Sequence, residues 1–279
     1  MAAGFSTMVG TTLVVLAGLF IVLIIVRRLW VIPRRHGPSW PLQPELLLFA
    51  WIAFLLAGIG GSLIASRLFE GVEGLESRAL SMLVAYALQG VMIVVVGVLV
   101  ARARRSESSD PLPSRSSFGA SVGIGCVGFL VAFPLAQSVG MLVGWVQRVV
   151  SDVTPDLVAH DTLKDLQDAP GDPWGIVIML LVVLVTPVIE EFAYRGMVQQ
   201  GFRRIGGNRT GAIALTSCLF VFMHVPALPE ASIASAVATL LTLSVLLGWL
   251  FERTGRLITP IIAHGLFNLG NLALAQYMM

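Results

Sequence analysis

Eight runs of about 20 mostly apolar residues occupy most of this chain, and each is long enough to form a helix that crosses a lipid bilayer. Only 12% of the 279 residues are charged and the mean hydropathy is +0.87, values that exclude a soluble globular protein and a disordered chain. The sequence therefore predicts an all-α polytopic membrane protein. The predicted spans are roughly Phe5–Val26, Glu45–Ser66, Ala79–Ala101, Phe118–Trp145, Trp174–Tyr194, Thr210–Leu228, Ala231–Leu250 and Leu257–Tyr277.

The basic residues alternate along the chain in step with these spans. Of the 18 Lys and Arg residues, only Arg67, Arg78, Arg148 and Lys164 lie outside the loops that follow the first, third, fifth and seventh spans. The positive-inside rule places those arginine-rich loops in the cytoplasm and both termini outside. Because the first span has basic residues after it and none before it, the reverse of a secretory signal, we expect an uncleaved helix.

Two connecting segments suggest how the chain is divided. The segment 102–117 is rich in Arg, Ser and Pro and is typical of a flexible linker. We expect a scaffold of three spans over residues 1–117, the fourth span with an acidic outer segment over 118–173, and a core of four spans over 174–279. The outer segment is either a short helix on the membrane face that begins near Thr154-Pro155, or a solvated connector.

Charge and cysteine content exclude further classes. The net charge of +2 is too small and too scattered for a nucleic-acid-binding protein. Cys126 and Cys218 both lie in apolar runs and provide neither a disulfide framework nor a zinc-binding spacing.

Ionisable side chains inside membrane spans are costly and usually functional, and here they cluster in the last hundred residues. Glu190 and Glu191 lie near the end of the fifth span, where Arg195 follows Glu191 by one helical turn and can pair with it. Glu190 is rotated by about 100° and stays free for another partner. Two adjacent carboxylates in a low dielectric cannot both ionise cheaply without a compensating cation. The pattern suits a general base beside a structural ion pair, or an interfacial ion pair alone.

Two further polar elements follow on later spans. His224 ends the run Phe220-Val221-Phe222-Met223-His224, and His264 shares a helix face with Asn268. Counted from the flanking arginines, Glu190 and His224 lie about 20 Å and about 22 Å deep, but His264 lies only about 12 Å deep. Each element alone could be a structural contact, whereas together they predict one shared polar site.

Around His264, two small-scale features bear on packing. Gly265 leaves room beside His264 for another backbone or for a substrate. Pro260 is expected to break or tilt the start of this helix.

These motifs, taken in order, resemble the CPBP family, the CAAX prenyl protease and bacteriocin-processing family that is also called Abi. Its signature is E-E-x-x-x-R, then F-x-x-x-H, then H-x-x-x-N or H-x-x-x-D, and this chain has Glu190, Glu191 and Arg195, then Phe220 and His224, then His264 and Asn268. The resemblance covers about residues 174–277 and does not extend to the first four spans. It implies an intramembrane endopeptidase in a prokaryotic plasma membrane.

By motif position, the resemblance implies a role for each residue. Glu190 with His224 would activate a water, and His264 and Asn268 would stabilise the oxyanion. Glu191 and Arg195 would hold the site together. Family members are commonly labelled metalloproteases, so zinc bound by Glu190, His224 and His264 is one alternative. The H-E-x-x-H motif of soluble zinc proteases is absent, and we favour a metal-free water activated by glutamate.

Three functions compete on these residues. The first is a membrane protease acting on a membrane-associated peptide or protein, such as a CAAX-type tail or a peptide precursor. The second is a transporter with a Glu-His proton relay, although repeated halves are not evident in the sequence. The third is a non-catalytic binding or immunity scaffold that keeps the same fold.

Overall fold

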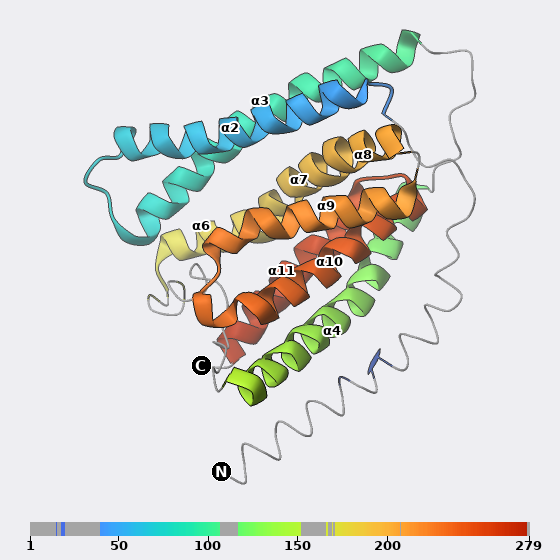
Figure 1. The fold of residues 1–279 in the computed structure, drawn as a ribbon. Helices are drawn as coiled ribbons and strands as arrows, with labels where there is room; N and C mark the ends of the chain where they lie inside the picture. Colours follow the sequence, from blue (N-terminus) through green and yellow to red (C-terminus); the bar gives the residue numbers. More distant parts are fainter. Residues whose placement is uncertain are drawn as a thin grey trace.

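The computed structural model describes residues 40–106, 117–151, 171–206 and 208–277, with a few isolated positions elsewhere. Within these residues every regular element is helical (Figure 1). Seven helical segments of this described part are long and apolar enough to cross a membrane, and they coincide with the second to eighth predicted spans. The first predicted span, 5–26, lies outside the described residues, as do residues 107–116 of the linker and most of the acidic outer segment. The division into domains stays a prediction.

The first described helices form an antiparallel hairpin, α2 (Pro44–Leu68) and α3 (Gly74–Ser106). Pro44 begins α2, a position where its missing N–H has no intrahelical partner to lose. The two helices pack closely because Gly61 has no side chain: a Cβ there would lie 2.5 Å from the Cα of Ala85. This close approach lets α3 pack directly against α2 at this point.

The fifth predicted span is one helical rod, Pro173–Gly206, with changes of helix type inside it. Its successive segments are α6 (Pro173–Leu180), the π-helix η1 (Leu181–Val185), α7 (Thr186–Glu191), the π-helix η2 (Phe192–Val198) and α8 (Gln199–Gly206). Asp172 caps its start by accepting a hydrogen bond from the Trp174 backbone N–H at 2.8 Å. Single π-helical turns are often found at functional sites, and here two of them bracket the paired glutamates.

The remaining helices complete a bundle around this rod. They are α4 (Phe118–Ser151), α9 (Arg209–His224) with the 3₁₀ turn η3 (Val225–Ala227), the 3₁₀ turn η4 (Glu230–Ser232), α10 (Ile233–Thr254) and α11 (Ile258–Tyr277). α4 packs on α10 and α11 through small buried residues, as is usual between helices in lipid. These are Gly125, Gly128, Ala132, Ala136 and Gly140.

Pro260 does not break α11. The helix begins at Ile258, so Pro260 lies in its first turn, where a missing backbone N–H costs no hydrogen bond within the helix. The expectation that Pro260 breaks the helix is therefore wrong, and α11 presents a continuous helix to the site.

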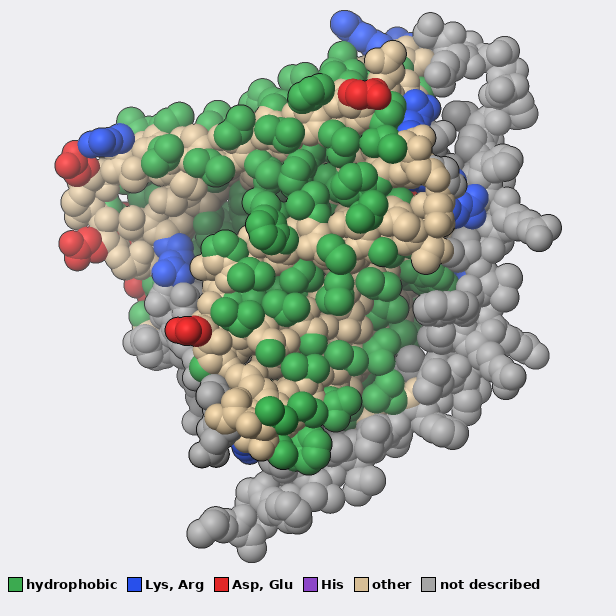
Figure 2. All heavy atoms as spheres, viewed as in Figure 1, with side chains coloured by type: hydrophobic (Ala, Val, Ile, Leu, Met, Phe, Trp, Pro, Cys, Tyr) green, Lys and Arg blue, Asp and Glu red, His purple; other side chains and the backbone are tan. Residues whose placement is uncertain are grey.

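The surface fits a protein surrounded by lipid. Large apolar side chains are exposed along the lengths of the helices, such as Phe49 and Leu56 on α2, and Figure 2 shows them as a broad hydrophobic band with charged side chains near the helix ends. Arg203, Arg209 and Arg256 lie in the region where α8 ends and α9 and α11 begin. The chain is thus a multi-pass integral membrane protein, while the side of the membrane that this end faces stays a prediction.

Candidate active site

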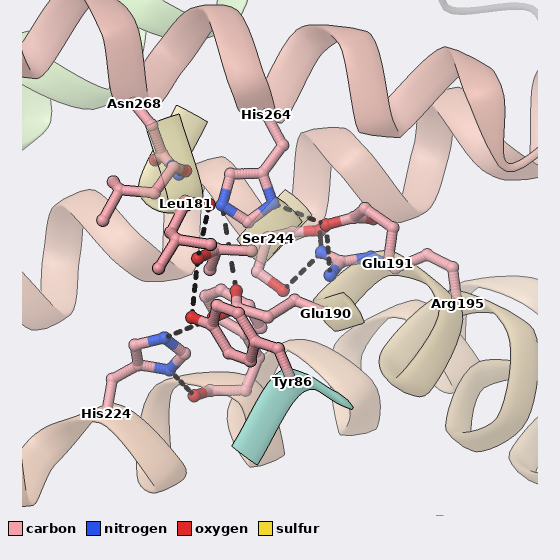
Figure 3. Close-up of polar contacts among 12 residues, drawn as sticks. Tyr86, Leu181, Glu190, Glu191, Arg195, His224, Ser244, His264 and Asn268 are labelled. Carbon is pink, nitrogen blue, oxygen red and sulfur yellow. Dashed lines mark hydrogen bonds and ion pairs between the residues drawn. The ribbon is translucent and has the colours of Figure 1, made fainter. Parts of the chain in front are cut away.

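Four segments of the bundle bring the ionisable residues of three distant motifs into one cluster (Figure 3). α7 ends with Glu190 and Glu191, η2 carries Arg195, α9 ends at His224, and α11 carries His264 with Asn268 one turn later. The 10 Å disagreement in depth inferred from the flanking arginines does not persist, since both imidazoles reach Glu190. The arginines that flank different spans are therefore not equivalent depth markers, and two π-helical segments interrupt the fifth span.

A buried ion pair forms the centre of the cluster. Arg195 donates from one terminal nitrogen to Glu191 Oε1 at 3.1 Å, and the side chains of both residues are fully buried. Its other terminal nitrogen donates to the Ser244 carbonyl and hydroxyl oxygens of α10, each at 2.9 Å. His264 donates from Nδ1 to the same Glu191 oxygen at 2.8 Å. Glu191 thus joins the fifth span to α11, and Arg195 joins it to α10.

Glu190 has a different environment from its neighbour. Its carboxylate lies between two imidazoles, with Oε1 3.7 Å from His224 Nε2 and Oε2 3.8 Å from His264 Nε2. The Glu190 side chain is 21% exposed, whereas that of Glu191 is fully buried. Glu190 is consequently the carboxylate that can meet a small molecule such as water, as its rotation from Glu191 on the helix predicts.

The ring orientation of His224 is set by its own helix. Nδ1 lies 2.6 Å from the Phe220 carbonyl oxygen, which can only accept, so Nδ1 carries the proton of this hydrogen bond. The His224 ring also stacks on the Phe220 ring at 4.3 Å. Nε2 is left to face Glu190. The Phe-x-x-x-His spacing therefore has a physical basis, because one turn of helix places both the ring and the carbonyl of Phe220 against the imidazole.

Asn268 and Gly265 fasten α11 to the π-helical segment η1. The Asn268 side-chain amide donates to the Val182 carbonyl at 2.9 Å, which leaves its second N–H for another acceptor. A Cβ on Gly265 would lie 2.7 Å from the Val183 carbonyl oxygen. The room that the sequence predicts beside His264 is thus used by the backbone of η1.

Two further side chains of the cluster carry no recognisable sequence signal. Ser244 is a single hydroxyl in an apolar span, and nothing in its neighbours marks it as the partner of Arg195. Tyr86 comes from α3, a helix without any motif, and its hydroxyl lies 2.7 Å from Thr186 Oγ1 at the start of α7. Their positions follow from the packing of helices that are distant in the sequence.

The zinc alternative can be compared with this geometry. Glu190, His224 and His264 are donors of the type that zinc accepts, and both Nε2 atoms face the carboxylate. Within the described part of the chain, however, no three His, Cys, Asp or Glu side chains converge as a metal-binding group. The donor types suit zinc, whereas no metal-binding group is found among the described residues, and no chemical step below is assigned to a metal.

Comparison with family models finds one match that covers the whole cluster apart from Tyr86. Residues 172–270 match the model of the Rce1-like family, described as type II CAAX prenyl endopeptidase Rce1-like. Over this segment, the chain is similar to the Rce1-like family. No curated protein and no solved structure matches the chain significantly.

The Rce1-like segment runs from the start of the fifth span to α11, and it confirms the resemblance to CAAX proteases that the three motifs indicate. The family is one of CAAX-type peptidases, so the enzyme class is supported at that level. The α2–α3 hairpin and α4 lie outside the matched residues. Tyr86 is therefore a contribution to this cluster from a part of the chain that the family model does not describe.

Proposed function

We propose that the chain is an intramembrane endopeptidase in which Glu190, assisted by His224, activates the water that hydrolyses a peptide bond. The observation that carries the proposal is the placement of the partly exposed Glu190 carboxylate between two imidazole Nε2 atoms. A carboxylate and an imidazole that converge on one point can share the proton of a water, as general base catalysis requires.

In the first step, the water held at Glu190 transfers a proton to the carboxylate while its oxygen attacks the scissile carbonyl carbon. His224 is suited to assist because its Nδ1 is engaged by the Phe220 carbonyl, which directs Nε2 toward Glu190. Glu191 cannot take this role, since it is buried and already accepts from Arg195 and His264. The two adjacent glutamates therefore have different roles: Glu190 faces the substrate, and Glu191 connects the helices.

The second step needs donors for the oxyanion that forms on the carbonyl oxygen. We assign this role to the free N–H of the Asn268 amide and to His264 Nε2, which donates when the imidazole carries a proton on both nitrogens; the two residues share one face of α11. Such donors are far more effective in a water-poor site than in bulk solvent. Collapse of the intermediate then breaks the C–N bond, and the proton taken from water passes to the leaving amine.

The substrate class follows from the family and from the position of the site. The Rce1-like family consists of CAAX prenyl endopeptidases, and the catalytic cluster lies within the apolar length of the bundle. We propose a substrate that is itself anchored in the bilayer, either a CAAX-type C-terminal tail or a peptide precursor. A lipid-anchored chain can approach such a site from within the bilayer.

The test uses the full chain reconstituted in lipid vesicles with two peptide sets, prenylated C-terminal CAAX peptides and unmodified precursor-type peptides. We expect cleavage with one ¹⁸O atom from labelled water in the new carboxylate, and its loss in Glu190→Gln. Glu230→Gln, at an exposed position on η4, is the matched control and should cleave as the parent does.

The outcomes of this test separate the competing functions. Undiminished cleavage by Glu190→Gln would refute the assignment of the general base. Absence of cleavage with proton-coupled uptake into the vesicles would favour a transporter. Full cellular function of the Glu190→Gln protein would favour a binding or immunity scaffold.

We also propose that the reaction proceeds without a metal ion. The test is elemental analysis of purified, active protein together with activity after chelation. Activity that persists with far less than one metal ion per chain supports the proposal. Stoichiometric zinc, with activity lost on chelation and restored by zinc, would overturn it.

A further inference from the structure

The Tyr86 hydroxyl begins a short relay of hydrogen bonds that passes through α7, the segment that carries the general base. Tyr86 Oη lies 2.7 Å from Thr186 Oγ1, and Thr186 Oγ1 donates to the Leu181 carbonyl at 3.1 Å. Because the single Thr186 proton is used toward Leu181, the Tyr86 hydroxyl is the donor to Thr186. The relay therefore runs from α3, through the first residue of α7, to the first residue of η1.

Thr186 lies on the same face of α7 as Glu190, one helical turn before it. Figure 3 shows the Tyr86 ring beside Glu190, between that residue and the ribbon of α3. A hydrogen bond that holds Thr186 therefore holds the turn of helix from which Glu190 projects.

The rotation of α7 about its axis depends on hydrogen bonds from neighbouring spans. α7 has only six residues and is bracketed by the π-helical segments η1 and η2, so no uninterrupted α-helical ladder fixes its rotation from either side. A π turn is an interruption of the regular ladder. A hydrogen bond from a neighbouring span can select one rotation of α7, and with it one direction of the Glu190 side chain.

Contacts with α2 on both sides of Tyr86 position α3 as the reference for this hydrogen bond. α3 is packed against α2 at Ala85, the residue before Tyr86, through the close approach to Gly61. Gln89, less than one turn later, donates from its side-chain amide to the Phe54 carbonyl of α2 at 3.4 Å. The Tyr86 ring itself packs against the buried cluster that includes Phe54, Ile189 and Tyr194.

We propose that Tyr86 is a positioning residue for Glu190, supplied by the N-terminal hairpin and acting through Thr186. The inference rests on the proposed function of Glu190 as the general base. It makes the α2–α3 hairpin a working part of the enzyme, although the hairpin lies outside the Rce1-like segment. A displacement of a reacting group by about 1 Å can lower the rate by about 10²-fold, so one hydroxyl is sufficient to matter.

The first experiment is steady-state kinetics of Tyr86→Phe in lipid vesicles, with the peptide substrate that the parent cleaves. This change removes one oxygen and leaves the aromatic packing intact. We expect kcat to fall about 10- to 100-fold, with KM within about twofold of the parent, because the hydroxyl acts on the general base and does not bind substrate. An unchanged kcat, or a loss expressed in KM alone, would overturn the proposal.

The second experiment removes the same hydrogen bond from its other side. Thr186→Val keeps the shape of the side chain and should reproduce the loss in kcat, while Thr186→Ser keeps the hydroxyl and should restore most of it. Thr242→Val is the matched control: the Thr242 hydroxyl donates to the Ala238 carbonyl of its own helix, and its removal should leave kcat unchanged.

A double-mutant cycle decides whether Tyr86 acts through Thr186. If both residues serve one relay, Tyr86→Phe combined with Thr186→Val should lose no more activity than the worse single variant. Losses that multiply would overturn the proposal.

Glu190→Gln is measured in the same preparation. If Glu190→Gln is inactive while Tyr86→Phe is fully active, only the positioning role is wrong. If Glu190→Gln retains activity, the proposed function itself has failed.

Discussion

Arg195→Met should be among the most destabilising single substitutions in this protein. Arg195 is fully buried and makes three hydrogen bonds, one to Glu191 and two to Ser244. Methionine fills much of the same volume but leaves the Glu191 carboxylate in the apolar interior with His264 as its remaining partner. Removal of one member of a buried ion pair costs about 3–5 kcal/mol, because the other charge stays buried. We expect a loss of this size in the free energy of unfolding.

The measurement is reversible unfolding in mixed micelles, followed by tryptophan fluorescence and compared with the parent protein. Arg67→Met is the control, because Arg67 is exposed in the last turn of α2 and its loss should change the unfolding free energy by less than about 0.5 kcal/mol. Glu191→Leu combined with Arg195→Met removes both charges and should recover part of the stability lost in the single variant.

The relation between the single and double variants tests the reasoning. The argument attributes the loss to an unpaired buried charge and not to the missing contacts of one long side chain. If the double variant is less stable than Arg195→Met, the carboxylate is not the source of the penalty. If Arg195→Met costs less than about 1 kcal/mol, the pair contributes no more than an ordinary exposed salt bridge.

Three further predictions follow, two on contacts between helices and one on the oxyanion site. Gly265→Ala places a Cβ against the Val183 carbonyl, so it should lower the free energy of unfolding by about 1–3 kcal/mol in the same assay and should also lower kcat. Gly90→Ala is the control, because the space around Gly90 is open and the added Cβ should not destabilise the protein. Equal stability of the two variants would refute the predicted clash. Glu252→Gln weakens the pairing with Arg203, whose terminal nitrogen lies 2.9 Å from the carboxylate. It should lower the free energy of unfolding by about 1 kcal/mol and leave kcat unchanged. A large loss of kcat would show that this ion pair contributes to the active site. Asn268→Ala should lower kcat about 10²-fold with little change in KM; a normal kcat would remove it from the oxyanion site.

Much of the bundle could be predicted from the sequence because the bilayer constrains it so strongly. A span in lipid must satisfy its own backbone hydrogen bonds, so every long apolar run becomes a helix. The boundaries of the seven described spans follow from this rule within about six residues, except that the fifth runs twelve residues past its predicted end at Tyr194, to Gly206. The pairing of Glu191 with Arg195 was equally accessible, since a four-residue spacing on a helix places the two side chains on one face.

Other features were beyond the sequence for identifiable reasons. Depth counted from flanking arginines assumes straight α-helices and equivalent ends, and the π-helical segments η1 and η2 violate the first assumption. Pro260 was expected to disturb α11, but whether a proline interrupts a helix depends on where the helix begins. Ser244 and Tyr86 are single polar residues in apolar spans, and their partners lie 49 and 100 residues away.

The sequence by itself determined the chemistry of this protein: an all-helical membrane chain whose intramembrane acids, imidazoles and amide are too costly in lipid to be incidental. Tertiary structure alone decided the division of labour among them. Packing of α11 against the fifth span places His264 beside both glutamates, and packing of α10 places Ser244 beside Arg195. As a result, Glu191 is enclosed and Glu190 faces two imidazoles. Spacing along one helix is encoded locally, whereas contacts between helices depend on how side chains from the entire bundle fit together.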